Sequence, residues 1–241
     1  MPHPSDSDPR HASRSRQAFR AVRSQVRPGS FPVLLAAGLL LYVMNGLALE
    51  SPAGVAIMTL LRSAVICAGI YVLSASRTTL WLGLFMLALV IVFAAHLWTF
   101  DPLVREAVQD GLTTGFVAWV LFVVLREVFR ASTTERNAVI GALCGFVLLV
   151  LIFARVHGLL EALTPGSYHT DGPALAERSD AEQVATFQYF STITLTTVGF
   201  GDIFPVTRAA RLATGLEAIS GQIYLAVVVA TLVGRVAARN Q

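Results

Sequence analysis

The fold of this chain is decided at residues 196–202, which read Thr-Thr-Val-Gly-Phe-Gly-Asp. The preceding stretch, residues 181–195, has the pattern of a helix of about four turns, roughly 20 Å long, which is too short to cross a bilayer. Apolar runs long enough to cross lie on both sides, so the short helix must enter and leave on one face of the membrane. We therefore predict a re-entrant loop, because non-helical backbone at membrane depth must be buried in protein or line a water-filled path.

The sequence also predicts how this loop is built. Ser179 and Glu182 have the spacing of a capping box and would start the short helix. Its C-terminal end carries a partial negative charge, which favours a cation at the membrane centre. Gly199 and Gly201 reach backbone angles closed to other residues, so the strand can turn successive carbonyls to one side. Four such strands around an axis would form carbonyl rings that replace the water shell of a cation about the size of potassium.

Composition excludes several classes of protein. Of the 241 residues, 55% are hydrophobic and 14% are charged, whereas a soluble domain is about a quarter charged. An ordinary soluble enzyme and a disordered protein are therefore excluded. All 18 basic residues are Arg, and their placement fits a membrane-topology rule better than a nucleic-acid-binding patch. Cys67 and Cys144 lie inside apolar runs and provide neither a disulfide framework nor a metal-ligand spacing.

Six apolar runs are long enough to cross a membrane, given that about 20 residues suffice. They are residues 32–49, 54–73, 80–98, 112–129, 138–160 and 209–236. We predict an all-α membrane protein with six transmembrane helices and a re-entrant pore helix and filter loop between the fifth and sixth. With six spans both termini lie on the same side, and most of the arginines fall on that side. The positive-inside rule then places both termini in the cytoplasm, and we expect a bacterial inner (plasma) membrane.

The stretch 196–202 resembles the selectivity-filter signature of tetrameric potassium channels, with Phe200 at the aromatic position usually held by Tyr. The resemblance covers roughly residues 137–241: outer helix, pore helix, filter and inner helix. It implies K⁺ coordination by the hydroxyl and carbonyl oxygens of one residue and the carbonyls of the next three. These ion-coordinating residues would be Thr197, Val198, Gly199 and Phe200.

The same resemblance implies roles around the filter. The supporting residues would be Thr196, Gly201, Asp202 and Tyr189. Tyr189 occupies a pore-helix position whose aromatic ring can hydrogen-bond the filter Asp202. Many family members carry a Glu nine residues before that Asp, where this chain has Ile193. Gly221 matches the hinge glycine of the family's inner helix.

The resemblance also divides the chain. We expect a basic, flexible cytoplasmic arm at residues 1–32, a four-helix transmembrane scaffold at residues 33–136 and a pore domain at residues 137–241. The scaffold stands where six-span channels carry a voltage sensor, which needs repeated Arg along one helical stripe. Its fourth span has only Arg126 and Arg130, both near the cytoplasmic end. We therefore predict a scaffold without gating charge.

Several polar residues lie within the apolar runs. Glu217 in the last span has either a gating role or a structural one, in which a hydrogen-bonded Glu locks the inner helix to the pore helix with help from Ser220 and Gln222. Arg62 in the second span is a structural charge-pair anchor, a ligand contact or a boundary residue whose side chain snorkels to the membrane surface. The three histidines nearest the spans are expected at interfaces or in loops. They are His96, His157 and His169.

The predicted function is passive potassium conduction, with no catalysis and no cofactor beyond the permeant K⁺. One subunit supplies one filter strand, so we expect a homotetramer in membrane lipid, with no nucleic acid and no obligatory small-molecule ligand. Two alternatives stay open: a weakly selective cation channel, and a polytopic transporter or scaffold with a coincidental loop. A transporter would carry broken helices in paired repeats, and the sequence has no internal repeat.

Overall fold

The structure is a computed structural model that describes residues 30–48, 51–74, 77–78, 80–85, 88, 102–130 and 135–239. Nearly all of the predicted basic arm (residues 1–32) and most of the predicted third span (residues 80–98) lie outside the described residues. The helices in chain order are α2 (Ser30–Gly46), α3 (Pro52–Leu73), α5 (Pro102–Val128), α6 (Glu135–Leu163), the 3₁₀ helix η2 (Leu175–Glu177), α7 (Asp180–Leu195) and α8 (Arg208–Arg239). Two short strands, β1 (Tyr168–Thr170) and β2 (Ile203–Pro205), complete the described elements.

These elements confirm the predicted all-α membrane fold. Helices α2, α3, α6 and α8 coincide with the first, second, fifth and last predicted spans to within a few residues. Three segments of the described chain are long and apolar enough to cross a membrane. They are Asp110–Val128, Arg136–Leu163 and Arg208–Thr231. Two shorter apolar helices, Ser30–Gly46 and Leu60–Leu73, accompany them.

The start of α5 differs from the prediction. Residues 99–111 lie between the predicted spans 80–98 and 112–129 and were therefore expected to connect them, yet α5 begins at Pro102. Proline suits the first turn of a helix, and the polar residues that follow are mostly good helix formers. The extension lets Asp110 form an ion pair with Arg155 of α6, with N–O distances of 3.2 and 3.3 Å. The apolar run therefore begins about ten residues after the helix does, because the first turns of α5 contain polar and charged residues.

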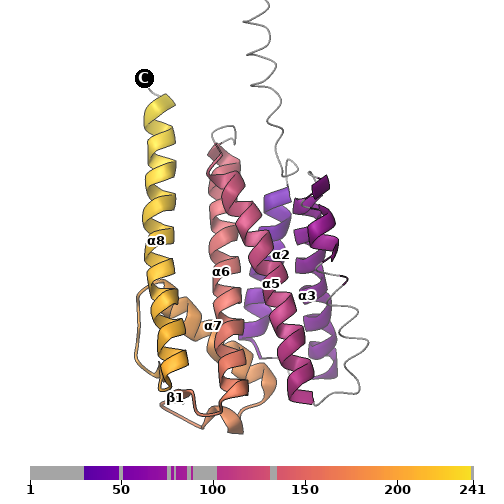
Figure 1. Cartoon of the computed structure of the whole chain (residues 1–241), viewed down its shortest axis with the longest axis vertical. Helices are drawn as coiled ribbons and strands as arrows, with labels where there is room; N and C mark the ends of the chain where they lie inside the picture. Colours follow the sequence, from indigo (N-terminus) through magenta and orange to yellow (C-terminus); the bar gives the residue numbers. More distant parts are fainter. Residues whose placement is uncertain are drawn as a thin grey trace, which may run out of the picture.

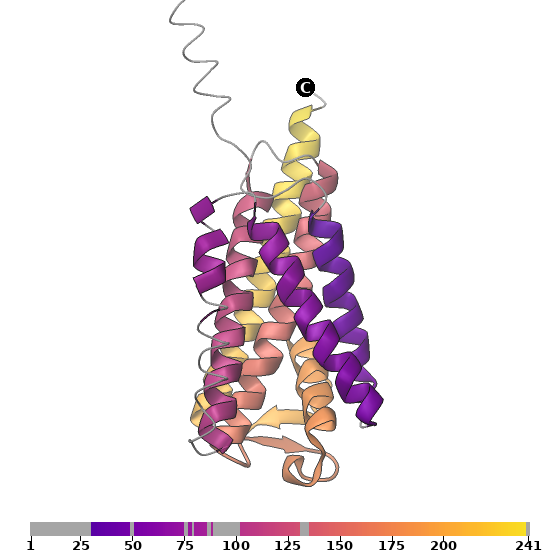
Figure 2. The same ribbon diagram turned by 90° about the vertical axis from the view of Figure 1, so that its right-hand side faces the viewer.

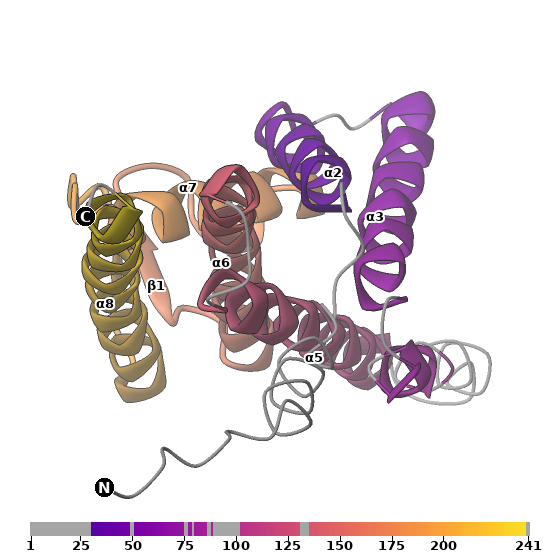
Figure 3. The ribbon, with the colours of Figure 1, turned by 90° about the horizontal axis from the view of Figure 1, so that it is seen from above.

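Helix α6 is the centre of the described bundle. It packs against α2, α5, α7 and α8, so the scaffold helices lie on one side of it and α8 lies on the other (Figure 1). Viewed from above, α2 and α3 stand well away from α8, with α6 and α7 between them (Figure 3). The larger apolar core joins α2, α3, α5 and α6 through residues such as Leu34, Val72, Val124 and Leu148.

A second, smaller core lies at the end of the bundle where α7 and the strands meet (Figure 2). Phe187 and Phe190 of α7 pack there with Tyr168 of β1 and Leu175 of η2. Strands β1 and β2 form an antiparallel pair in which Tyr168 faces Pro205 and Thr170 faces Ile203. The pairing ties the segment before α7 to the segment after residues 196–202, so both ends of the loop are fixed to one small core.

Candidate functional site

The short helix α7 is positioned by the predicted capping box. The Ser179 hydroxyl accepts a hydrogen bond from the Glu182 amide at 3.3 Å, and the Ser179 amide donates to the Glu182 carboxylate at 3.1 Å. The first turn carries two acidic side chains, Asp180 and Glu182, whose negative charges interact favourably with the positive end of the helix dipole. The helix ends at Leu195, and its carbonyl end leads directly into residues 196–202.

The backbone of residues 196–202, the predicted filter loop, alternates in the sign of φ. Thr197, Gly199 and Gly201 have positive φ values of 60°, 55° and 80°, and the residues between them do not. The amides of Val198 and Gly199 both donate to the Ile193 carbonyl, at 2.8 and 3.3 Å. The loop is thus folded back over the last turn of α7. Because φ alternates in sign, successive carbonyls of the strand turn toward the same side.

Thr197 is a feature that the sequence did not reveal. Only the glycines were expected in the left-handed region, where a β-branched residue is a conformational outlier. The strain costs of the order of 1–3 kcal/mol and is typical of functional positions. The Thr197 amide donates to the Thr194 carbonyl at 3.0 Å, which helps to hold this conformation.

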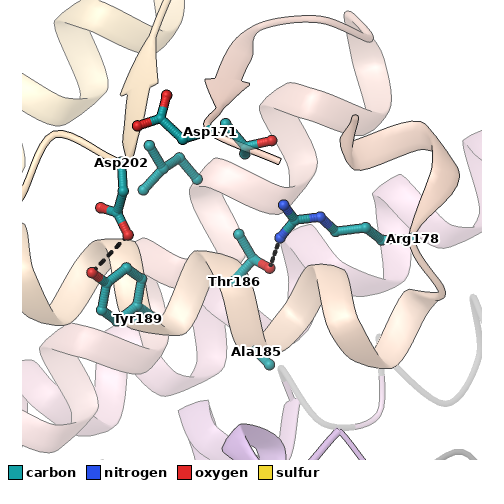
Figure 4. A pocket seen from close by; sticks show the side chains of 8 residues that line it. Asp171, Arg178, Ala185, Thr186, Tyr189 and Asp202 are labelled. Atoms are coloured by element: carbon teal, nitrogen blue, oxygen red, sulfur yellow. Dashed lines mark hydrogen bonds between the residues drawn. The ribbon is translucent and has the colours of Figure 1, made fainter. Parts of the chain in front are cut away.

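Asp202 at the end of the loop is bonded as the sequence suggested. The Tyr189 hydroxyl donates to the Asp202 carboxylate at 2.8 Å, and the Asp202 carbonyl accepts from the Asp171 amide at 2.9 Å. A pocket of about 330 Å³ opens beside this pair (Figure 4). On its far wall the Arg178 guanidinium donates to the Thr186 hydroxyl at 2.9 Å. Tyr189 therefore ties the middle of α7 to the far end of the loop.

A buried polar cluster lies where α6, α7, α8 and β1 meet, and we call it the Glu217 cluster: Ser191, Glu217, His157 and Tyr168. The Glu217 side chain has no exposed surface; it accepts a short hydrogen bond from the Ser191 hydroxyl, and its other oxygen lies 2.7 Å from His157 Nε2. His157 Nδ1 lies 2.6 Å from the Tyr168 hydroxyl. The structure thus favours the structural interpretation of Glu217, in which it bonds α8 to α7.

Two details of this region differ from the predictions. His157 was expected at an interface or in a loop, yet it is fully buried on α6. The sequence did contain a signal for this burial: His157 lies inside an apolar run, and an ionisable residue there needs a buried partner. Ser220 was expected to help satisfy Glu217, but its hydroxyl donates to the Leu216 carbonyl of its own helix. His169 lies exposed on β1 against Phe204, as expected for a loop histidine.

Burial changes the ionisation of Tyr168, which lies in β1 outside the membrane-spanning segments. Its loss of solvent raises the pKa of the phenol above its ordinary value, and the carboxylates of Glu217 and Glu161 raise it further. The phenol therefore stays protonated and can donate to His157. Glu161 in turn accepts the amides of Gly166 and Tyr168, at 2.8 and 3.1 Å, and holds the start of β1 on α6.

The remaining predicted residues are spread over the bundle. Gly221 lies where α8 meets the end of α7, and a Cβ added to it would be 2.5 Å from the Leu195 carbonyl oxygen. Tyr224 of α8 donates a short hydrogen bond to the Ala142 carbonyl and so joins α8 to α6. Gln222 is exposed on α8, and Arg62 is exposed on α3 within electrostatic range of Arg155 and Asp110.

Contacts from α2 to α7 were not predicted. The Asn45 amide donates to the Gln188 side-chain oxygen at 3.1 Å, and Gln188 donates to the Tyr42 carbonyl at 2.8 Å. The Tyr42 hydroxyl lies 3.0 Å from the Thr192 hydroxyl. The first scaffold helix is therefore hydrogen-bonded to the helix that carries the filter loop. In the sequence, Tyr42 and Asn45 are polar residues near the end of an apolar run, and nothing local indicates that their partners lie on α7.

These elements define a class of protein: a membrane protein in which a re-entrant helix and a glycine-containing loop stand between two transmembrane helices. Residues 145–238, from α6 to α8, match the family model described as "Ion channel".

Parts of the chain are also similar to curated potassium channels. "Voltage-gated potassium channel Kch" of Escherichia coli (strain K12) is 28% identical over 143 residues, which are 58% of this chain and 28% of that protein. "Voltage-gated potassium channel KCNC1" of Mus musculus is 32% identical over 110 residues, 46% of this chain and 20% of that protein. The chain spans less than a third of the length of these relatives. No solved structure matches. The resemblance to potassium channels that was drawn from residues 196–202 is confirmed by these matches.

Proposed function

We propose that the chain is one subunit of a homotetrameric, potassium-selective channel that conducts K⁺ passively across a plasma membrane. The observation that carries the proposal is the alternating sign of φ at Thr197, Gly199 and Gly201 in an exposed strand. Four copies of this strand around an axis would supply stacked oxygen rings of the kind that replace the hydration shell of K⁺. In each ring K⁺ would meet the Thr197 hydroxyl or the carbonyls of residues 197–200.

The surface of the chain supports assembly around an axis. Residues 196–201 are exposed, and no atom lies within 4 Å of a Cβ built on Gly199 or Gly201. The face of α8 beside them is apolar and exposed. It carries Leu212, Leu216, Ile219 and Ile223, each more than half exposed. Copies of the chain and lipid would cover this face. We propose that residues 137–241 form the pore domain and residues 33–136 the scaffold.

The arrangement of the ends supports the proposed topology. Tyr42 and Asn45, near the end of α2, contact α7, so the start of α2 lies at the opposite end of the bundle. The C-terminal end of α8 also lies far from α7 (Figure 1). We propose that this shared end is cytoplasmic and that the filter loop opens to the outer side.

The test is ion flux in liposomes that contain only the full-length protein, with K⁺, Rb⁺ and Na⁺ compared. The wild type should pass K⁺ and Rb⁺ and exclude Na⁺. Gly199→Ala should abolish K⁺ flux: it adds no clash within the chain, but a φ of 55° costs alanine about 1–2 kcal/mol, and the cost recurs in each of the four proposed strands. Gly115→Ala is the matched control, because it adds the same methyl group to open space on α5.

Three outcomes would contradict the proposal. Equal K⁺ and Na⁺ flux in the wild type would make the chain a weakly selective cation channel. Wild-type flux in a correctly assembled Gly199→Ala protein would remove the filter assignment. A conducting monomer or dimer in native mass measurement would exclude the four-strand ring.

A further inference from the structure

The Glu217 cluster joins four elements inside an apolar core. Ser191 comes from α7, Glu217 from α8, His157 from α6 and Tyr168 from β1. The first three have no exposed surface and Tyr168 has only 5%. The Ser191 hydroxyl also lies 3.1 Å from the Val150 carbonyl of α6, so three helices meet at this one side chain.

The surroundings of the cluster exclude water. The rings of Phe153, Phe187 and Phe190 lie 5.0–6.5 Å from the His157 ring. One proton arrangement satisfies the polar atoms: Tyr168 donates to His157 Nδ1, His157 Nε2 donates to Glu217, and Ser191 donates to the other Glu217 oxygen. Removal of one partner would leave buried polar groups unpaired, which is strongly destabilising.

The cluster lies next to both ends of the filter loop. Upstream, Ser191 is two residues before Ile193, whose carbonyl holds the amides of Val198 and Gly199. Downstream, Tyr168 begins β1, which pairs with β2 directly after the loop. One helical turn beyond Glu217, Gly221 touches the Leu195 backbone. A shift of α7 along or about its axis would therefore break the Ser191–Glu217 bond and move the loop.

We propose that Glu217, His157 and Ser191 are positioning residues for the filter: their hydrogen bonds fix the height and rotation of α7 and thereby set the discrimination of K⁺ from Na⁺. The proposal rests on the proposed function. It assigns selectivity in this chain to a bond between the inner and pore helices, at a point where Ile193 offers no polar group behind the filter. The hydrogen bonds, rather than the negative charge as such, carry the effect.

The test compares three substitutions in the full-length protein in liposomes. Glu217→Ala removes both bonds. Glu217→Gln can keep both, because its oxygen can accept from His157 Nε2 and its amide can donate to the Ser191 hydroxyl, which then donates to the Val150 carbonyl. Ser220→Ala, three residues along α8, removes a hydroxyl that bonds only its own helix in the described contacts and is the matched control. We expect the K⁺/Na⁺ flux ratio to fall about tenfold in Glu217→Ala, the equivalent of one lost buried interaction. Glu217→Gln and Ser220→Ala should stay near wild type.

A second readout follows the position of the loop directly. Hydrogen exchange of the full-length protein should be faster across residues 191–202 in Glu217→Ala and unchanged in Glu217→Gln. If Glu217→Ala does not assemble, Ser191→Ala replaces it in the test, because it removes only one hydroxyl. It should show a smaller fall in the K⁺/Na⁺ flux ratio and a smaller increase in hydrogen exchange.

The outcomes separate this proposal from the proposed function. A wild-type protein without K⁺-selective flux would overturn the proposed function, and this proposal with it. A selective wild type whose Glu217→Ala and Ser191→Ala variants assemble and keep the wild-type flux ratio would overturn the positioning role alone. A Glu217→Gln protein as unselective as Glu217→Ala would show that the charge, not the bonding geometry, is what matters, and would equally overturn it.

Discussion

Substitution of Gly221 by alanine should disturb the filter through the backbone of α7. A Cβ at this position would lie 2.5 Å from the Leu195 carbonyl oxygen, 2.9 Å from its Cα and 3.1 Å from its carbonyl carbon. Close carbon–oxygen contacts in proteins are about 3.3 Å, so the two backbones must separate by about 0.8 Å. Neither side of the contact is a flexible side chain, so α8 or the end of α7 must move.

The expected cost follows from this geometry. Overpacking of a tight interior contact typically destabilises by about 1–3 kcal/mol. Leu195 directly precedes the filter loop, so part of the displacement passes to Thr196 and Thr197. We expect Gly221→Ala to lower the thermal stability of the assembled protein and to reduce K⁺ flux.

The assay is thermal unfolding in detergent together with liposome K⁺ flux. Gly234→Ala is the matched control, since it lies on the same helix with nothing within 4 Å of its Cβ. Alanine is the better helix former by about 1 kcal/mol, so the control should be neutral or stabilising. A Gly221→Ala protein as stable and as conductive as wild type would refute the close-contact reasoning. Unchanged stability with altered opening would instead favour the hinge role.

Three further predictions concern the loop, the scaffold and voltage. Thr197→Ala removes the hydroxyl oxygen at one end of the filter, so barium block of K⁺ flux should weaken; unchanged block would mean that this hydroxyl does not face the ion. Asn45→Leu should lower the free energy of unfolding by about 1 kcal/mol, and Gln188→Leu should lower it further because it also removes the bond to the Tyr42 carbonyl; a double-mutant cycle should show coupling through the bond that the two side chains share. Open probability should vary only weakly between about −100 and +100 mV in planar bilayers, since steep gating needs about three to four charges per subunit moving through the field. A steep voltage curve that vanishes in an Arg126→Gln, Arg130→Gln double variant would contradict that expectation.

The sequence by itself determined the class of fold and the short helix that precedes residues 196–202. Apolar run length is a local property that the bilayer thickness converts directly into spans, and it placed α2, α3, α6 and α8. The capping box at Ser179 and Glu182 is equally local, because its two bonds close within one turn. The glycines of residues 196–202 indicated a backbone with positive φ, because the freedom to adopt that conformation is a property of glycine itself.

Only the tertiary structure decided which side chains meet. Ser191 and Glu217 are 26 residues apart and His157 and Glu217 are 60 apart, so no local pattern pairs them. The side chain of Asn45 donates a hydrogen bond to that of Gln188, 143 residues later in the chain, because α2 packs against α7. The left-handed conformation of Thr197 is likewise imposed by the bonds that fold the loop over Ile193. Spans, caps and glycines follow from short-range physics, whereas the partners of buried polar groups depend on how whole helices pack, which the order of residues along the chain does not display.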